Sequence, residues 1–275
     1  MPHLCFGARL FWYAFQCTIG RVSPLLQLEP PLVATEALSG LLSDLYRRQV
    51  EELPGETYLR EHSDPAFLRG TVAVYRFYEP WLPREGRILD WGCHHAPDAC
   101  LIRARFGSRF TVDGCDIFDR ALYPIFFEHA GLRYLPLPDA VRLPYADGSF
   151  DGAIASGVLE HVPMDYESLK ELYRVLKPGG RLILTYLPNA ASVEEWGLRR
   201  RGRDDSHRRR YSPSHLRALL THSGFWPRLI AHQTQLDALP ADDRSIRWLR
   251  PVARAAQLHR LTSCLCAVAE KTTYF

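Results

Sequence analysis

Apolar residues recur at helical spacing in two groups near the start of the chain. A period of three to four residues places such side chains on one face of a helix. Pro54-Gly55 lies between the groups and indicates a turn. We therefore predict a helical N-terminal extension over residues 1–84. The two groups are Leu38, Leu41, Leu42, Leu45 and Tyr46, and then Leu68, Val72, Tyr75 and Tyr78.

From residue 87 onward, short apolar runs of strand length alternate with segments of helical periodicity. This alternation is typical of a parallel sheet whose strands are joined by crossover helices. We predict an α/β fold, a Rossmann-like doubly wound seven-stranded sheet in a domain of residues 85–275. The predicted strands are 88–92, 110–117, 133–137, 150–156, 181–187, 225–233 and 264–271, and the predicted helices are 97–106, 121–130, 165–176, 213–223 and 246–258.

Particular residue types mark where these helices begin and end. Pro97 suits the first position of a helix, and Gly107 suits its end. Asp165 and Ser212 have side chains that can cap the helices that follow them. Residues 177–180, which read KPGG, indicate a sharp end to the preceding helix.

The composition is that of a globular protein with free thiols. The chain has 275 residues and a formal net charge of +3, which does not call for nucleic acid as a partner. The odd count of seven cysteines, several of them in predicted core elements, is typical of a reducing cytoplasm. No two cysteines have zinc-site spacing, and adjacent histidines such as His94 and His95 rarely converge on one ion, so we expect no metal.

An apolar run covers residues 4–19. It is shorter than the ~20 residues of a transmembrane helix and lacks the features of a secretory signal. An upstream helix is one interpretation. The other is peripheral membrane contact through Phe11, Trp12, Tyr13 and Phe15.

The residues that follow the predicted strands carry the candidate chemistry, because doubly wound sheets bind ligands at the carboxyl ends of their strands. The first strand ends in residues 90–96, which read DWGCHHA, and a glycine there lets the backbone approach a ligand. Asp116 follows Gly92 at about the 20-residue interval at which nucleotide-binding sheets place an acid on the ribose. Asp113 lies inside the same strand, and we prefer Asp116.

A longer stretch, residues 139–182, carries a family resemblance. It contains in order DA, LPY, DGSFD, SGVLEHV and RVLKPGGRL. Order, spacing and residue type together strongly resemble the class I S-adenosylmethionine-dependent methyltransferases, in the branch that methylates small molecules such as quinones, sugars and polyketides. The resemblance extends over residues 87–271 and implies S-adenosylmethionine as the cofactor.

The resemblance also implies roles for individual residues. Asp90, Gly92 and Ser156 are expected at the methionine end of the cofactor, Asp116 at its ribose, and Asp139 at its adenine amino group. His161 is the candidate catalytic residue, because histidine can orient or deprotonate an acceptor; a structural role is the alternative. The full set of expected cofactor-binding residues is Asp90, Gly92, Cys93, His94, Asp116, Ile117, Asp139, Ala140 and Ser156.

The first loop departs from the family pattern Gly-x-Gly-x-Gly, because His94 and Ala96 occupy the second and third glycine positions. A side chain at position 94 would crowd the cofactor unless the loop moves aside. Asp98 adds a negative charge at a helix N-terminus that relatives offer to the cofactor carboxylate. A catalytically degenerate, methyltransferase-like binding protein is therefore an alternative function. A dinucleotide oxidoreductase is a second alternative function, but the missing glycine fingerprint argues against it.

Residues 199–210 carry seven arginines and follow the fifth predicted strand, where relatives build part of the acceptor pocket. Arginine recognises phosphate and carboxylate through a forked pair of hydrogen bonds. We therefore expect an anionic small-molecule or lipid-linked acceptor, contacted by His207, Arg209 and Tyr211. A solvated loop is the alternative. The sequence as a whole predicts direct methyl transfer under an N-terminal helical cap.

Overall fold

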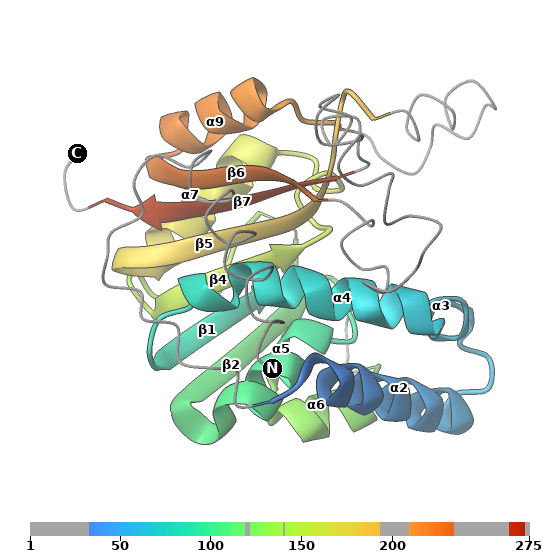
Figure 1. Ribbon diagram of the computed structural model, residues 1–275. Coiled ribbons are helices and arrows are strands. Elements are labelled where there is room, and N and C mark those ends of the chain that lie inside the picture. Colours follow the sequence, from blue (N-terminus) through green and yellow to red (C-terminus); the bar gives the residue numbers. More distant parts are fainter. Residues whose placement is uncertain (1–32, 119–121, 140, 193–208, 234–263, 273–275) are drawn as a thin grey trace, which may run out of the picture. The chain divides into compact units, whose positions relative to one another are not determined.

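A computed structural model of the chain contains a seven-stranded sheet with the strand order β3-β2-β1-β4-β5-β7-β6 (Figure 1). The structure describes residues 33–118, 122–139, 141–192, 209–233 and 264–272. The first five strands in this order are mutually parallel, and β7 pairs antiparallel with both β5 and β6. The doubly wound sheet predicted from the sequence is therefore confirmed. Its strands are β1 (Gly86–Trp91), β2 (Phe110–Asp116), β3 (Arg133–Pro136), β4 (Phe150–Ser156), β5 (Leu176–Pro188), β6 (Phe225–Gln233) and β7 (Cys264–Lys271).

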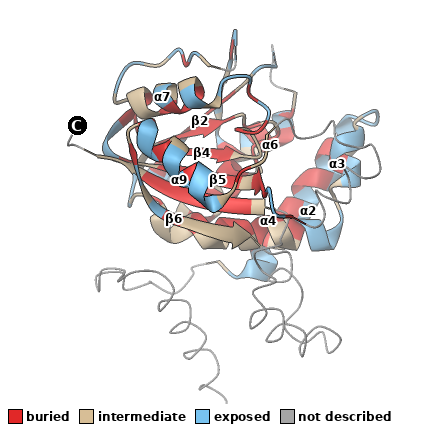
Figure 2. Cartoon of the chain, turned by 90° about the horizontal axis from the view of Figure 1, so that it is seen from above, coloured by how far each residue is buried: buried red, intermediate tan, exposed pale blue. Residues whose placement is uncertain are grey.

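Helices cover both faces of this sheet (Figures 1 and 2). On one face α7 (Asp165–Val175) and α9 (Pro213–His222) bury apolar side chains in a core that the strands share. On the other, α5 (Pro97–Phe106) and α6 (Pro124–Ala130) pack beside α2 (Thr35–Glu52), α3 (Thr57–Glu61) and α4 (Pro65–Tyr78). Two short 3₁₀ turns, η1 (Glu79–Trp81) and η2 (Gly107–Arg109), complete the described elements.

Several helix ends follow the predicted residues. Pro97 is the first residue of α5, and Gly107 follows its last residue. The Ser212 side chain accepts a hydrogen bond from the backbone N–H of His215, at 3.2 Å, and so caps α9. The helix predicted over 121–130 begins at Pro124 within the described residues.

The predicted cap at Asp165 is wrong. Met164 is the N-cap residue of α7, and Asp165 is already its first helical residue. One carboxylate oxygen of Asp165 accepts from the N–H of Tyr166 at 2.9 Å, and the other accepts from the hydroxyl of Tyr211 at 3.3 Å. Asp165 therefore ties α7 to the segment before α9.

The end of α7 also differs from the prediction. The helix ends at Val175, and β5 begins at Leu176, which pairs with Phe150 of β4. The register then shifts, so that Gly152 pairs with Arg181. The predicted break over residues 177–180 is an irregularity inside the strand, because Pro178 cannot donate a ladder hydrogen bond.

Residues 32–275 form one compact unit, which includes the described helices of the predicted extension. Side-chain hydrogen bonds join its N-terminal helices to the sheet domain. Gln49 of α2 accepts from the backbone N–H of Ile125 in α6 at 3.1 Å. The predicted helix over 246–258 and the aromatic run near residue 11 lie outside the described residues.

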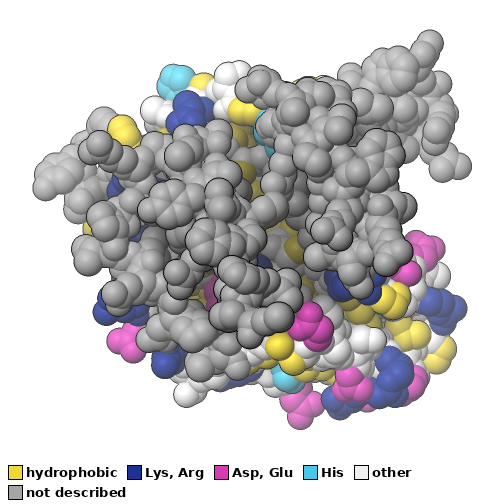
Figure 3. All heavy atoms as spheres, in the orientation of Figure 1, with side chains coloured by type: hydrophobic (Ala, Val, Ile, Leu, Met, Phe, Trp, Pro, Cys, Tyr) yellow, Lys and Arg dark blue, Asp and Glu magenta, His cyan; other side chains and the backbone are white. Residues whose placement is uncertain are grey.

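The surface of the described residues mixes charges of both signs. In the lower part of the face in Figure 3, acidic and basic side chains are interspersed, and α2 contributes an exposed cluster in which Arg47 pairs with Asp44 and Glu51. No described helix is long and apolar enough to cross a membrane. Within the same residues, no group of three or more metal-ligating side chains comes together, and the five described cysteines are free.

Candidate functional site

Four polar residues that the sequence singled out end or follow neighbouring strands. Asp90 lies near the end of β1, Asp116 ends β2, Asp139 follows β3, and Ser156 ends β4. Because β3, β2, β1 and β4 are adjacent and parallel, these side chains form a row along the carboxyl edge of the sheet. Strands spaced by about 4.8 Å give that row a length of about 14 Å.

Asp116 is held in place by backbone donors. Its Oδ2 accepts from the N–H of His94 at 2.9 Å, and its Oδ1 accepts from the N–H of Ile117 at 2.7 Å. Each oxygen keeps a lone pair for a further donor. Asp113, by contrast, is buried and bonded to Arg87 and Arg133, so its carboxylate is already used within the sheet. This arrangement supports the choice of Asp116 over Asp113.

Asp139 begins the loop that leads to β4. Its Oδ1 accepts from the N–H groups of Val141 and Arg142, at 2.8 and 2.7 Å. These backbone hydrogen bonds, first that of Arg142, lower the pKa of the exposed Asp139 carboxyl and keep it charged. Ala140, the next expected contact, lies outside the described residues.

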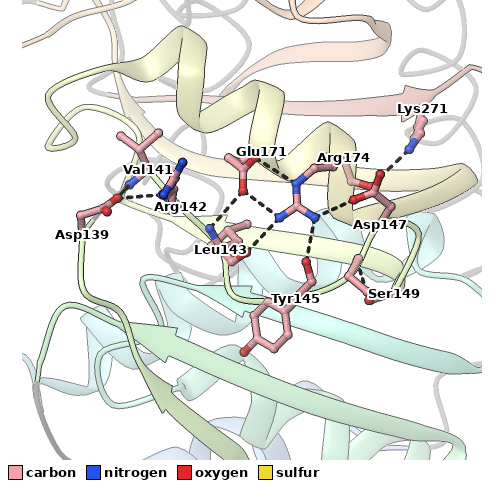
Figure 4. Close-up of polar contacts among 11 residues, drawn as sticks. Asp139, Val141, Arg142, Leu143, Tyr145, Asp147, Ser149, Glu171, Arg174 and Lys271 are labelled. Carbon is pink, nitrogen blue, oxygen red and sulfur yellow. Dashed lines mark hydrogen bonds and ion pairs between the residues drawn. The ribbon is translucent and has the colours of Figure 1, made fainter.

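Arg174 of α7 fastens the loop after Asp139 (Figure 4). Its guanidinium donates to the carbonyl oxygens of Leu143 and Tyr145, at 2.9 and 2.7 Å, and pairs with the carboxylates of Asp147 and Glu171. Arg174 lies in one of the sequence motifs, but the sequence alone predicted no role for it. The guanidinium of arginine has five N–H donors and can bind two carbonyls and two carboxylates at once. This explains why the residue at this position is an arginine.

The loop after β1 keeps a glycine-like backbone in spite of its side chains. His94 and Ala96 have φ angles of 43° and 55°, and Gly92 has a φ of 68°. A Cβ atom at Gly92 would come within 2.5 Å of the Val158 side chain, so glycine is required at that position. Positive φ costs a non-glycine residue roughly 1–2 kcal/mol. His94 and Ala96 therefore adopt the left-handed backbone that favours glycine.

The His94 ring lies in a cluster of aromatic side chains. Its Nδ1 lies 3.0 Å from Nδ1 of His95, and its Nε2 lies 3.0 Å from the hydroxyl of Tyr123. Nε2 of His95 lies 2.6 Å from the hydroxyl of Tyr46 in α2. Tyr58 stands edge-on to His94 with ring centroids 4.8 Å apart. Burial lowers the pKa of both histidines, that of His95 strongly, so both imidazoles are neutral at pH 7.

Cys93 and Gly92 offer little to a ligand through their N–H groups. Both donate to the carbonyl oxygen of Cys115, at 3.2 and 2.8 Å, and the Cys93 side chain is buried. Ile117 differs from them, because it is 64% exposed beside Asp116. Among the described residues of the expected cofactor contacts, Ile117 therefore presents the largest open apolar surface.

Asp98 is turned inward, in contrast to the expected charge at an open helix N-terminus. It is 6% exposed, and its Oδ2 accepts from the hydroxyl of Ser156 at 2.6 Å. Its Oδ1 accepts from the hydroxyl of Tyr78 in α4. The apolar pattern of the sequence predicted Tyr78 as a core residue. Its phenol oxygen was the only feature of the sequence that indicated this contact.

The remaining candidates lie beyond β4. His161 has a side chain that is 53% exposed, with Nε2 3.8 Å from the buried Glu160 carboxylate. Arg209 donates to the carbonyl oxygens of Val162 and Pro163. Tyr211 is fully buried, and its one hydroxyl proton is shared between the carbonyl oxygen of Leu159 and the carboxylate of Asp165, at 3.2 and 3.3 Å. This burial favours a structural role for Tyr211, and its expected contact with an acceptor stays a prediction. His207 lies outside the described residues.

Known proteins share part of this sequence. A 34% identical relative, the demethylmenaquinone methyltransferase of Staphylococcus epidermidis, aligns over 35% of this chain and 41% of its own length. The 27-O-demethylrifamycin SV methyltransferase of Amycolatopsis mediterranei is also 34% identical, over 39% of this chain and 42% of its own length. The chain thus spans less than half the length of these two relatives.

Solved structures share the fold. The 1,6-didemethyltoxoflavin-N1-methyltransferase of Burkholderia thailandensis, solved with S-adenosylhomocysteine, superposes with a TM-score of 0.55 at 17% identity and covers 89% of this chain and 93% of its own. The cyclase SpnF superposes with a TM-score of 0.52 at 16% identity, over 88% of this chain and 98% of its own. The model of a family described as a methyltransferase domain matches residues 61–228. That match covers more than half of the chain, which therefore belongs to the methyltransferase domain family and has the class I fold that its motifs predict.

Proposed function

We propose that the chain is an S-adenosylmethionine-dependent methyltransferase that transfers the methyl group directly to a small-molecule acceptor. The observation that carries the proposal is the row of Asp139, Asp116 and Asp90 along three adjacent strand ends. Its order matches the adenine, ribose and methionine parts of the cofactor, and its length of about 10 Å, two strand spacings, suits an extended ligand of that kind.

The residues present fit this cofactor. Asp116 has lone pairs left for two ribose hydroxyls, and the exposed Ile117 side chain offers a flat contact for adenine. Asp90 is 3% exposed, and its Oδ2 has no hydrogen-bond partner among the described residues. A buried oxygen without a partner is costly, and the ammonium group of the methionine part would satisfy it. The bound cofactor supplies an electrophilic methyl group.

The chain itself contributes positioning. The fixed loop after β1 and the Arg174-fastened loop after Asp139 hold two sides of the cofactor, which reduces the entropy lost in bringing the reactants together. His161 follows β4 at the same edge of the sheet and is exposed, so it is our candidate for the group that orients or deprotonates the acceptor.

The acceptor class rests on the relatives and on the arginine-rich segment. The relatives named above are methyltransferases of demethylmenaquinone and of 27-O-demethylrifamycin SV, which supports a small-molecule or lipid-linked acceptor here. An anionic group on that acceptor would suit the arginines of residues 199–210. We further propose that helices α2 to α4 cap the acceptor site. The cysteines of the described residues are free, which supports a reducing compartment such as the cytoplasm.

A binding role without catalysis is the second candidate, favoured by the strained His94 and Ala96 in the first loop. Calorimetry tests both candidates. The wild-type chain should bind S-adenosylhomocysteine and not NAD(P), and Asp116→Ala should weaken binding by roughly 1.5–3 kcal/mol through loss of a charged acceptor.

Asp44→Ala, which removes an exposed carboxylate of α2, is the matched control and should bind like the wild type. Undiminished binding by the Asp116 variant would remove Asp116 from the site. Formation of S-adenosylhomocysteine from S-adenosylmethionine with a panel of quinols, phenols and carboxylated phenols then separates an enzyme from a binding protein.

A further inference from the structure

Five ring side chains form a continuous strip beside the loop after β1. We call it the ring strip, and its members in spatial order are Phe118, His94, Tyr58, His62 and Phe67. Neighbouring ring centroids in that order lie 5.6, 4.8, 4.1 and 4.7 Å apart. The rings come from the segments that follow β2 and β1 and from the region of α3 and α4. Tertiary structure, not one local sequence pattern, therefore brings them together.

Much of the ring strip is open to solvent. Tyr58, Phe67 and Phe118 are 41%, 38% and 37% exposed, whereas most large apolar side chains of the described residues are buried. Single exposed apolar residues are ordinary on a protein surface, but exposed apolar side chains that gather in one place mark binding sites. The strip therefore needs a functional explanation.

Hydrogen bonds of the backbone carbonyls hold parts of the strip in place. The carbonyl oxygen of Phe118 accepts from the hydroxyl of Tyr134 at 2.7 Å. The carbonyl oxygen of Tyr58 accepts from Nδ1 of His62 at 2.7 Å, and the two rings are stacked. Side chains that are ordered before a ligand arrives lose less entropy when it binds. The strip is thus partly pre-formed as a binding surface.

The strip begins at the proposed ribose contact. His94 donates its backbone N–H to the Asp116 carboxylate at 2.9 Å, and Phe118 follows Asp116 closely in the chain. In S-adenosylmethionine the sulfonium is bonded to the 5′ carbon of the ribose, so the reactive methyl group lies only a few bonds from the ribose that Asp116 is proposed to hold. A molecule on the rings nearest Asp116 would therefore lie beside that methyl group.

The chemistry of the strip suits a flat, uncharged ring. Burial lowers the pKa of His94, so the imidazole in the middle of the strip is neutral at pH 7. Aromatic rings attract one another in stacked and edge-on arrangements, and Tyr58 already makes one contact of each kind, with His62 and His94. A saturated ring has apolar surface but no π-face, so it cannot form these contacts.

We propose that the ring strip binds the methyl acceptor and that this acceptor is a planar aromatic compound, stacked against Tyr58 and Phe118. The inference rests on the proposed function and names its substrate class. Both of these rings adjoin His94, so they are the part of the strip nearest the proposed ribose contact. Helices α3 and α4 then select the acceptor as well as cover it.

Small probes test the inference while the natural acceptor is unidentified. Naphthol is the aromatic probe, and decahydronaphthol has the same carbon skeleton without aromatic rings. Ligand-observed NMR titrations, with S-adenosylhomocysteine present at saturation to fill the adenine site, give the dissociation constant of each probe. We expect the wild-type chain to bind naphthol about fivefold more tightly than decahydronaphthol, the preference that one aromatic pair provides.

Tyr58→Ala removes a ring from the strip and should abolish most of the preference for naphthol, with unchanged affinity for S-adenosylhomocysteine. Tyr58→Phe keeps the ring and should keep the preference. The matched control is Tyr166→Ala on α7, because Tyr166 is 40% exposed and lies outside the strip. This control should bind both probes like the wild type. Both tyrosines are exposed, so their substitution leaves the buried core unchanged.

Equal affinity of the wild type for the two probes, or an undiminished preference in Tyr58→Ala, would overturn the inference. Tighter binding of methyl glucoside than of naphthol would also overturn it and would indicate a sugar acceptor. Binding of neither probe, the result expected if another segment covers the strip, would do the same. In all these cases, binding of S-adenosylhomocysteine leaves the proposed function intact. A wild-type chain that does not bind S-adenosylhomocysteine overturns the proposed function, and the inference with it.

Discussion

The Nδ1 atoms of His94 and His95 lie 3.0 Å apart, so one proton must serve both nitrogens. The hydroxyl of Tyr123 lies 3.0 Å from Nε2 of His94, and the hydroxyl of Tyr46 lies 2.6 Å from Nε2 of His95. A neutral imidazole donates through one nitrogen and accepts through the other, so the three bonds from Tyr123 to Tyr46 run in one direction. Reversing any one of these bonds requires the other two to reverse with it.

The neutral histidines make folding stability depend on pH. Burial holds the pKa of His95 well below its ordinary value of 6.5, so between 6.5 and the folded-state pKa the unfolded chain binds more protons. Stability should be fully present above pH 6.5 and fall as the pH drops below it, by up to ~1.4 kcal/mol per pH unit for each such histidine.

Urea unfolding of the wild type and His95→Gln between pH 7.5 and 5 measures this effect. The difference between the two curves should shrink as the pH falls, because the variant has no buried imidazole to protonate. A constant difference would show that His95 has an ordinary pKa. His215→Gln, on the surface of α9, is the control and should leave the slope unchanged.

Two substitutions at His94 separate backbone strain from side-chain contacts. Both His94→Ala and His94→Gly remove the ring and its bonds to His95 and Tyr123, but only glycine adopts a φ of 43° without strain. We expect both variants to be less stable than the wild type and the glycine variant to be about 1 kcal/mol more stable than the alanine variant. Equal unfolding midpoints would mean that the loop relaxes when the ring is gone.

We predict that Gly92 tolerates no side chain because of a steric clash. A substitution at a second glycine, Gly107, separates this clash from the cost of the backbone conformation. Gly107→Ala meets a positive φ and open space, so it should cost only the backbone term of roughly 1–2 kcal/mol. Gly92→Ala adds a clash with Val158 and should cost more. In the Val158→Ala background the two glycine substitutions should become similar. Persistence of the full penalty in that background would locate the clash elsewhere.

Arg174→Lys should loosen the loop that carries Asp139. Lysine keeps the charge but cannot bind two carbonyls and two carboxylates at once. We expect a loss of stability of about 2–3 kcal/mol from several charge-assisted bonds and a weaker affinity for S-adenosylhomocysteine. Arg47→Lys removes an arginine from the exposed ion pairs of α2 and is the control. A stable variant with unchanged affinity for S-adenosylhomocysteine would show that the loop keeps its conformation without the bonds of Arg174.

Much of the sheet was predictable because its strands are buried runs with clear boundaries. The ends of β4, β6 and β7 agree with the prediction, and the position of Asp116 follows from its spacing to Gly92. The start of β5 was not predictable, because its first residue pairs across a register shift that a local pattern does not record.

The contacts of the loop after β1 could not be predicted from the sequence, for a different reason. Tyr46 and His95 are 49 positions apart, and the apolar stripe of α2 accounted for Tyr46 without its hydroxyl. Asp98 was interpreted from its place in the helix, whereas its orientation depends on Tyr78 and Ser156, which belong to other elements. Local sequence gives the position of such groups but not their partners.

The hydrogen bond from the Ile125 N–H to Gln49 has a consequence for how this chain can diverge. Gln49 and Tyr46 lie one turn apart on α2, and each meets a buried group of the sheet domain. Losing either side chain would strand a donor or acceptor that water cannot reach. Changes in α2 and in the loops around His95 and Ile125 should therefore be inherited together, and the N-terminal helices cannot be exchanged between relatives as an independent module.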